Sequence, residues 1–348
     1  MKSFLLICIS LCMVFSMNAQ TSDAAETKDT IVSKNKYFDT LKGKISVRAN
    51  FSSDVKSYRI QDTESSLILT QNNSYRTSFT FDYRFFGVTL GFSPKFLPGN
   101  DDENLKGETE LSGIGFQFYF NKWLQRVSYE RIKGFYVENT GDFVEDWREG
   151  IDPYLQLSGL RTTTYAGNTA YKFNDNFSYP AISGYIHWQQ KSVGSFIPSL
   201  DYNYINIELK DTGDFTEIKS NEFNITLTPS YFYTFVYKKN WFLSLEASPG
   251  IGINFAKETD VDLVQNTSTT ENNSFLYYTY DSAAILGYNS SSFYGGARYN
   301  VKNLSNFDKS EENLLQTDNF FEFFIGYRFD APKFIKKSFD WVEEKTGL

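Results

Sequence analysis

Long stretches in which apolar and polar residues alternate with a period of two constrain the fold of this chain most strongly. The clearest stretch runs from Ser74 to Phe86, and similar alternation recurs at 241–255 and 321–329. In the first stretch one face carries Tyr75, Thr77, Phe79, Phe81, Tyr83 and Phe85. Soluble strands typically span about 5–6 residues, whereas strands that cross a membrane need about 9–11. The length of the stretches therefore favours membrane-spanning strands over a secreted β-sandwich, which is the alternative.

The composition excludes several classes of protein. The chain has 348 residues, of which 18% are aromatic, and it contains two Cys and one His. Its mean hydropathy of −0.41 excludes a bundle of membrane helices, and so few Cys and His leave no zinc site of the usual kind. The formal net charge of −8 argues against a nucleic-acid partner. We expect no cofactor and no metal site.

The N-terminus has the pattern of a secretory signal peptide. Lys2 precedes an apolar run from Phe4 to Val14, and Ala19 supplies a small residue for cleavage. The predicted organisation is a cleaved signal peptide at 1–19, a disordered leader at 20–41, a barrel at 42–330 and a C-terminal tail at 331–348. Both cysteines lie in the predicted signal peptide.

The fold class that these features predict is all-β, an antiparallel outer-membrane β-barrel of about twelve strands, with ten to fourteen possible. The predicted strands are 43–52, 74–86, 87–96, 109–121, 123–137, 157–173, 177–191, 219–237, 241–256, 274–286, 292–302 and 318–329. We assign 192–218 to an outer loop, although 196–209 has the pattern of a strand. If that stretch spans the membrane twice, the barrel has fourteen strands.

The C-terminal tail has the pattern of a short amphipathic helix. On a wheel of about 100° per residue, its apolar arc consists of Phe334, Ile335, Phe339, Trp341 and Val342. We expect it to lie in the membrane interface or to pack against the mouth of the barrel, with a frayed tail as the alternative.

Charged residues in the middle of the strands are predicted to face the lumen. By alternation the inward bases are Lys44, Arg48, Arg76, Arg84, Arg126, Arg298 and Arg328. The inward acids are Asp82, Glu130, Glu246, Asp281 and Glu322, and Tyr185 and His187 add polar groups. In a narrow barrel these charges must pair, because an unpaired buried charge is costly. In a wide one they line water and set ion preference.

Four segments resemble a known family. They are KFNDNFSYPAISGYIHWQQKSVGSF (172–196), TPSYFYTFVYKKNWFLSLEASPGIGINF (228–255), LGYNSSSFYGGARY (286–299) and FFIGYRFDAPK (323–333). They resemble a Bacteroidota family known as domain of unknown function 4421. The resemblance implies an outer-membrane barrel and no assigned reaction. Pro180 stands where such proteins commonly have arginine, which bears on the predicted start of the strand at 177–191.

Two functional hypotheses follow from the sequence. The first is a porin-like barrel in the outer membrane that passes or binds small solutes, and the second is a closed structural or partner-docking barrel. The expected partners are outer-membrane lipid, the barrel-assembly machinery during insertion and a small solute. We expect that the chain is not an enzyme, since it has no G-x-S-x-G motif. A barrel hydrolase that uses His187 is a distant third hypothesis.

Overall fold

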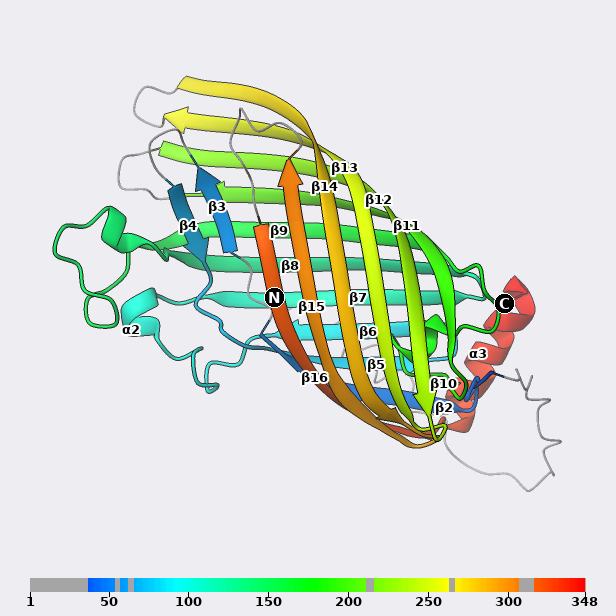
Figure 1. The fold of residues 1–348 in the computed structure, drawn as a ribbon. Coiled ribbons are helices and arrows are strands. Elements are labelled where there is room, and N and C mark those ends of the chain that lie inside the picture. Colours follow the sequence, from blue (N-terminus) through cyan, green and yellow to red (C-terminus); the bar gives the residue numbers. More distant parts are fainter. Residues whose placement is uncertain are drawn as a thin grey trace, which may run out of the picture. The chain divides into compact units, whose positions relative to one another are not determined.

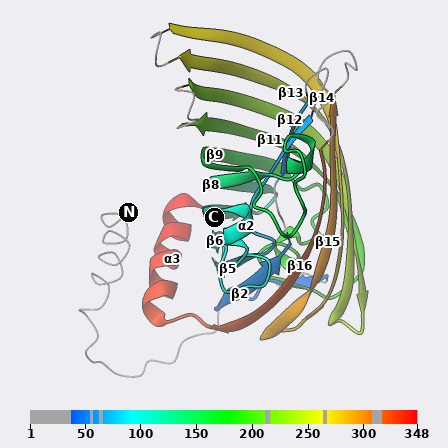
Figure 2. The same cartoon turned by 90° about the vertical axis from the view of Figure 1, so that its left-hand side faces the viewer.

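Twelve antiparallel strands form a closed barrel in the computed structural model (Figure 1, Figure 2). The structure describes residues 37–53, 57–61, 66–210, 216–262, 267–306 and 316–347, all within the unit Ser33–Leu348. The barrel strands are β2 (Lys44–Ser52), β5 (Arg76–Tyr83), β6 (Phe86–Phe92), β7 (Glu110–Phe120), β8 (Trp123–Val137), β9 (Gln156–Tyr171), β11 (Val193–Leu209), β12 (Thr216–Tyr237), β13 (Trp241–Asp262), β14 (Thr267–Asn289), β15 (Phe293–Asn306) and β16 (Gln316–Asp330). Each pairs with the next, and β16 pairs with β2. Closure leaves the barrel without an edge strand.

The two ends of the barrel differ in the length of their connections. One end, here called the short-turn end, has tight turns at 84–85, 121–122, 238–240 and 290–292. Asn121, Lys238 and Lys239 adopt positive φ there, as tight turns between strands require. The other end, the long-loop end, carries the hairpin β3 (Ser57–Gln61) and β4 (Ser66–Thr70), and the short helices α2 (Glu103–Lys106) and η1 (Thr140–Asp142).

The two faces of the wall have opposite chemistry. Phe81 of β5 is 44% exposed on the outside, and Leu227 and Phe323 are exposed outward in the same way. Thr80 and Asp82, the neighbours of Phe81, are buried inside. Within β5 the alternation around Phe81 therefore distributes the residues as predicted, with the apolar set outward and the polar set in the lumen.

Two strand assignments made from the sequence are wrong, and the errors cancel. The predicted strand at 177–191 does not span the wall, because this stretch folds into the barrel. It contains the short helix η2 (Tyr179–Ala181) and the two-residue strand β10 (Trp188–Gln189). The predicted outer loop at 192–218 instead holds β11, a wall strand paired with both β9 and β12. The stretches 257–272 and 303–317, which fall between predicted strands, also lie partly in strands, since β13 to β16 extend into them.

Of the predicted N-terminal segments, only the end of the leader lies within the described residues. The predicted signal peptide, 1–19, and the leader as far as residue 36 lie outside the described residues. The last residues of the predicted leader are ordered, and β1 (Phe38–Asp39) pairs with β10. Among the described residues, no helix combines the length and the apolar character needed to cross a membrane.

The C-terminal segment forms the helix α3 (Lys333–Thr346), which packs at the short-turn end (Figure 1). Phe339 contacts the rings of Tyr83 and Phe85 at centroid distances of 4.7 and 5.2 Å. Arg84 forms ion pairs with Asp340 (2.7 Å) and Glu343 (3.2 Å). Arg84 is thus in a turn that holds α3, and the prediction that it faces the lumen is wrong.

The facing of β5 gives a first testable prediction. Phe81→Arg places a cation in the lipid-facing band, which costs about 2–4 kcal/mol near the bilayer midplane. Ser78→Arg, on the lumen face of the same strand, should leave stability nearly unchanged because the lumen is polar. The measurement is urea unfolding of the protein refolded into lipid vesicles, with Phe81→Leu as the control. Equal losses for the two arginine variants would contradict the assigned faces.

Candidate functional site

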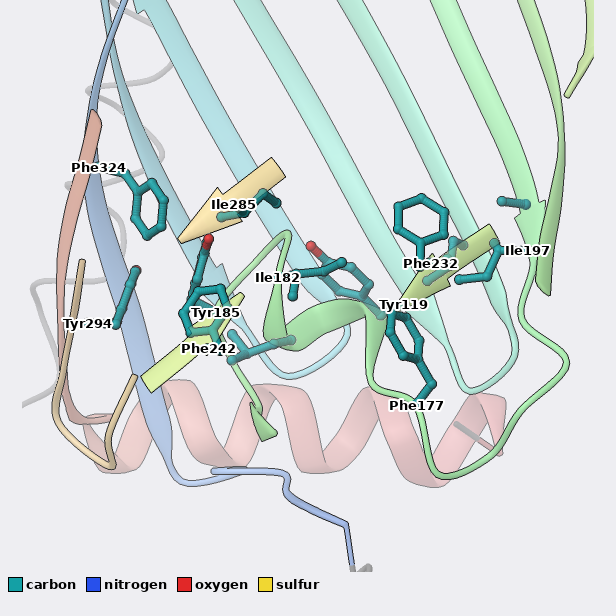
Figure 3. Packing of buried hydrophobic residues seen from close by; sticks show 13 residues of the cluster. Tyr119, Phe177, Ile182, Tyr185, Ile197, Phe232, Phe242, Ile285, Tyr294 and Phe324 are labelled. Carbon is teal, nitrogen blue, oxygen red and sulfur yellow. The ribbon is translucent and has the colours of Figure 1, made fainter. Parts of the chain in front are cut away.

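Residues 174–192, here called the plug, enter the barrel from the short-turn end. They connect β9 to β11, and Figure 3 shows their side chains among residues of the wall. The plug starts where the Asn174 amide donates to Ser195 Oγ (3.1 Å) and its side chain donates to Gly194 O (2.7 Å). These bonds hold the ends of β9 and β11 side by side while the chain between them turns inward.

Apolar packing fixes the plug against the wall. Phe177 is fully buried, and Ile182 and Ile186 are buried in the same cluster. The ring of Tyr185 stacks on that of Tyr294 with centroids 4.6 Å apart and an interplanar angle of 5° (Figure 3). Tyr185 also has a positive φ of 53°, which breaks the strand predicted here.

Arg328 of β16 joins the plug to the wall by hydrogen bonds. Its side chain is 1% exposed. Its Nε donates to the Tyr185 carbonyl of the plug, and Nη2 donates to Asn289 Oδ1 at 2.8 Å. Nη1 donates to Ser290 O, and the guanidinium lies 4.4 Å from the centroid of the Tyr294 ring. Each of the three nitrogens of the guanidinium therefore has a hydrogen-bond acceptor.

Strand β2 supplies the second set of hydrogen bonds to the plug. Arg48 donates from Nη1 to Ser183 O, and Ser46 Oγ donates to Gly184 O at 3.4 Å. The Ser183 hydroxyl also lies 3.1 Å from the hydroxyl of Tyr119. Side chains of β2 therefore provide donors for the plug carbonyls at Ser183 and Gly184, which have no partners in the sheet. Buried backbone groups outside a sheet need such partners.

His187 lies in the plug, where its ring contacts other protein side chains. Its Nδ1 lies 2.7 Å from Ser178 Oγ, and its ring stacks on Phe38 at 5.2 Å. Burial, and then the charge of Lys172, lower the pKa of His187 to about 3, so the imidazole is neutral. Ser178 is 1% exposed, and no hydrogen bond joins His187 to a carboxylate among the described residues. This geometry does not form the triad of a barrel hydrolase.

A cavity of about 260 Å³ lies against the plug, and we call it the chamber. Plug residues Tyr179, Ile182, Ser183 and Tyr185 form one side of it. The charged residues of its wall are Arg48, Arg126, Glu246, Arg298 and Glu322, all predicted from alternation to face the lumen.

The chamber charges meet few acidic partners. Arg298 Nη2 lies 3.4 Å from Glu246 Oε2. Among the described residues, no other ion pair joins two residues of the chamber lining. Arg126 donates from Nη2 to the Tyr179 hydroxyl at 2.7 Å. The chamber is thus a small polar site with a surplus of basic groups.

The other predicted lumen charges are not among the residues that line the chamber, although Asp82 lies directly behind Gln117 of the lining. Arg76 and Glu130 form an ion pair, and Asp82 is buried and accepts a hydrogen bond from Gln117. Lys44 and Asp281 are half-buried on the inward faces of β2 and β14. The described residues contain no cluster of His, Cys, Asp or Glu that could hold a metal ion.

Comparison with known proteins places the chain in a family. A family model described as "Domain of unknown function (DUF4421)" matches residues 27–329. The chain belongs to this family. A search of curated proteins found no match.

Solved structures similar to this family member are outer-membrane barrels. Outer-membrane expressed OmpT of Vibrio cholerae shares 9% identity over 86% of this chain and 100% of that chain, with a TM-score of 0.29. The outer membrane protease OmpT from Escherichia coli shares 8% over 83% and 97%, with a TM-score of 0.32. LpxR from Salmonella typhimurium shares 10% over 81% and 99%, also with a TM-score of 0.32. At these values the likeness concerns the barrel architecture alone.

The comparison corrects the expectation that the chain is not an enzyme. That expectation came from the absence of a catalytic motif in a barrel sequence. An outer membrane protease is among the similar barrels, so a barrel of this kind is not excluded from catalysis.

The sequence analysis missed the plug residues that form the chamber, Tyr179 and Ser183. The available signal was Pro180, since proline within an apparent strand argues against a central strand. In the structure Pro180 lies in the first turn of η2.

The neutral state of His187 predicts that acid loosens the plug. Its pKa is about 3 in the docked plug and about 6.5 when released. The released state therefore binds the proton first, and docking weakens as the pH falls from about 6.5 towards 3. Hydrogen exchange of the plug amides, corrected for intrinsic rates, should show less protection at about pH 4.5 than at neutral pH. His187→Asn should abolish the difference, and an equal difference in that variant would assign it to another group.

Proposed function

We propose that this chain is an outer-membrane barrel that is closed to free diffusion by its plug and binds a small solute in the chamber. The observation that carries the proposal is the buried guanidinium of Arg328, which bonds to the backbone of the plug at Tyr185. A plug joined to the wall by Arg328 and Arg48 is a fixed part of the structure. A fixed plug inside the lumen supports closure of the barrel to free diffusion.

Residence in the outer membrane is part of the proposal. The exposed apolar band of the wall supports it, together with exposed aromatic residues near the short-turn end, among them Trp123, Tyr237 and Trp241. Short turns face the periplasm in bacterial barrels and longer loops face outward. We therefore place the plug at the periplasmic end, with the predicted signal peptide directing export.

The two sequence hypotheses combine in this proposal. The closed lumen comes from the second hypothesis, and the binding of a small solute comes from the first. Solute binding is supported by the chamber, because a cavity with several converging polar and charged groups is the usual form of a ligand site. A purely structural, closed barrel would not need arginines that line a cavity without a direct ion pair.

Conductance in planar bilayers tests the closure. The wild-type protein should show no steady channel steps. Replacing 175–192 with a short Gly-Ser turn should open a pore, because Phe173 N already bonds to Phe196 O at 3.2 Å and the strand ends need little rearrangement. Step conductance and the fraction of inserted barrels that conduct are the quantities to measure.

The matched control replaces 143–150, an exposed stretch at the long-loop end, with the same turn. This variant should remain silent, since it leaves the plug in place. Steady conductance of the wild-type barrel, or silence of the folded plug-less variant, would contradict closure by the plug.

A further inference from the structure

Two arginines of the chamber form no direct ion pair among the described residues. Among the described residues, no ion pair involves Arg48 or Arg126, although both line the cavity. Arg48 lies 5.0 Å from the centroid of the Tyr185 ring, and Arg126 lies 5.2 Å from that of Tyr179. Each guanidinium therefore rests on an aromatic ring of the plug, which stabilises a cation without neutralising it.

The hydrogen bonds of these arginines leave donors free. Arg48 uses Nη1 for the Ser183 carbonyl, and its Nε is buried without a partner. Arg126 uses Nη2 for the Tyr179 hydroxyl. A guanidinium has five N–H donors in a planar fork. Buried donors without a partner are uncommon in proteins, so the remaining donors are available to an acceptor in the chamber.

The acids of the chamber are grouped around a third arginine. Glu246 pairs with Arg298 at 3.4 Å, and Arg298 is the register partner of Glu322 across β15 and β16. These three residues form a row on one part of the wall. The chamber lining therefore has three arginines and two glutamates, and the carboxyl group of Asp82 lies behind Gln117 of the lining.

We propose that the chamber binds a small organic anion, whose carboxylate or phosphate group accepts hydrogen bonds from Arg48 and Arg126. The proposal rests on the proposed function, because it takes the chamber to be the solute site. Guanidinium groups match carboxylate and phosphate in geometry and charge.

The size and the other lining groups restrict the body of the anion. The chamber is smaller than the about 300–1,000 Å³ that is usual for drug-sized ligands. Thr89, Gln117 and Ser128 provide hydrogen-bonding groups, while Phe232 and Phe324 provide flat apolar surface. This mixture fits a hydroxylated body of about the size of one sugar ring, which has polar edges and apolar faces.

Equilibrium dialysis of the detergent-solubilised full chain against four related probes tests the charge requirement. Glucose 6-phosphate and gluconate carry an anion, glucose is neutral and glucosamine is a cation. Both anions, or one of them, should bind more tightly than glucose by at least about tenfold, because hydrogen bonds to a charged group contribute about 1.5–3 kcal/mol. The better anion distinguishes phosphate from carboxylate. Equal binding of glucose, tighter binding of glucosamine, or binding of none at millimolar concentration would overturn the proposal.

Variants with the same change of charge locate the site. Arg126→Gln should weaken binding of the anion at least about tenfold, and Arg126→Lys should recover part of it. Arg76→Gln removes a lumen arginine that is paired with Glu130 outside the chamber, so it should bind as the wild type does. Equal loss in Arg126→Gln and Arg76→Gln would assign binding to the general charge of the lumen and overturn the site.

The closing measurement separates this proposal from the proposed function. Bilayer conductance of Arg126→Gln should stay silent, because Arg328 and Arg48 still hold the plug. Anion binding by a barrel that conducts would refute closure and retain the anion site. A silent barrel that binds no probe would refute the anion site and retain closure.

Discussion

A buried guanidinium that bonds to neutral oxygens joins the plug of this barrel to its wall. Arg328 donates to two backbone carbonyls and one side-chain amide, and its face lies on Tyr294. Breaking such a set is expensive, because a buried charge without its partners is strongly destabilising. Arg328 is on the last strand, and β2, which carries Arg48, pairs with that strand to close the barrel. The plug therefore finds its complete set of partners only when the first and last strands are together.

The wall was predictable from the sequence because its signal is local. Lipid on one side and a polar lumen on the other impose period-two alternation on each strand separately. The plug could not be predicted in that way. Ile182, Ile186 and Trp188 alternate like wall residues, yet the first two pack against wall side chains from distant strands. The strand count remained right because an even number of strands had to be kept, and β11 took the place of the misassigned stretch.

Facing was also easier to predict than pairing. The charged residues of the chamber were predicted to face inward, and they line one cavity. Which of them pair depends on strand order and on distances across the lumen, as with Arg76 of β5 and Glu130 of β8. Arg84 shows the limit of alternation, because β5 ends at Tyr83 while the periodic pattern continues through the turn at 84–85. Beyond the end of a strand, the alternation of the sequence no longer predicts which way a side chain points.

The chamber and the plug share residues, so their equilibria are linked. Tyr179 and Tyr185 belong to the plug, and each supports one of the arginines proposed to bind the anion. Arg48 also holds the plug directly through Ser183. A ligand that binds these arginines only when the tyrosines are beneath them stabilises the docked plug by the same factor by which docking raises its affinity. The plug is also anchored on the N-terminal side of β2, because β1 pairs with β10 of the plug.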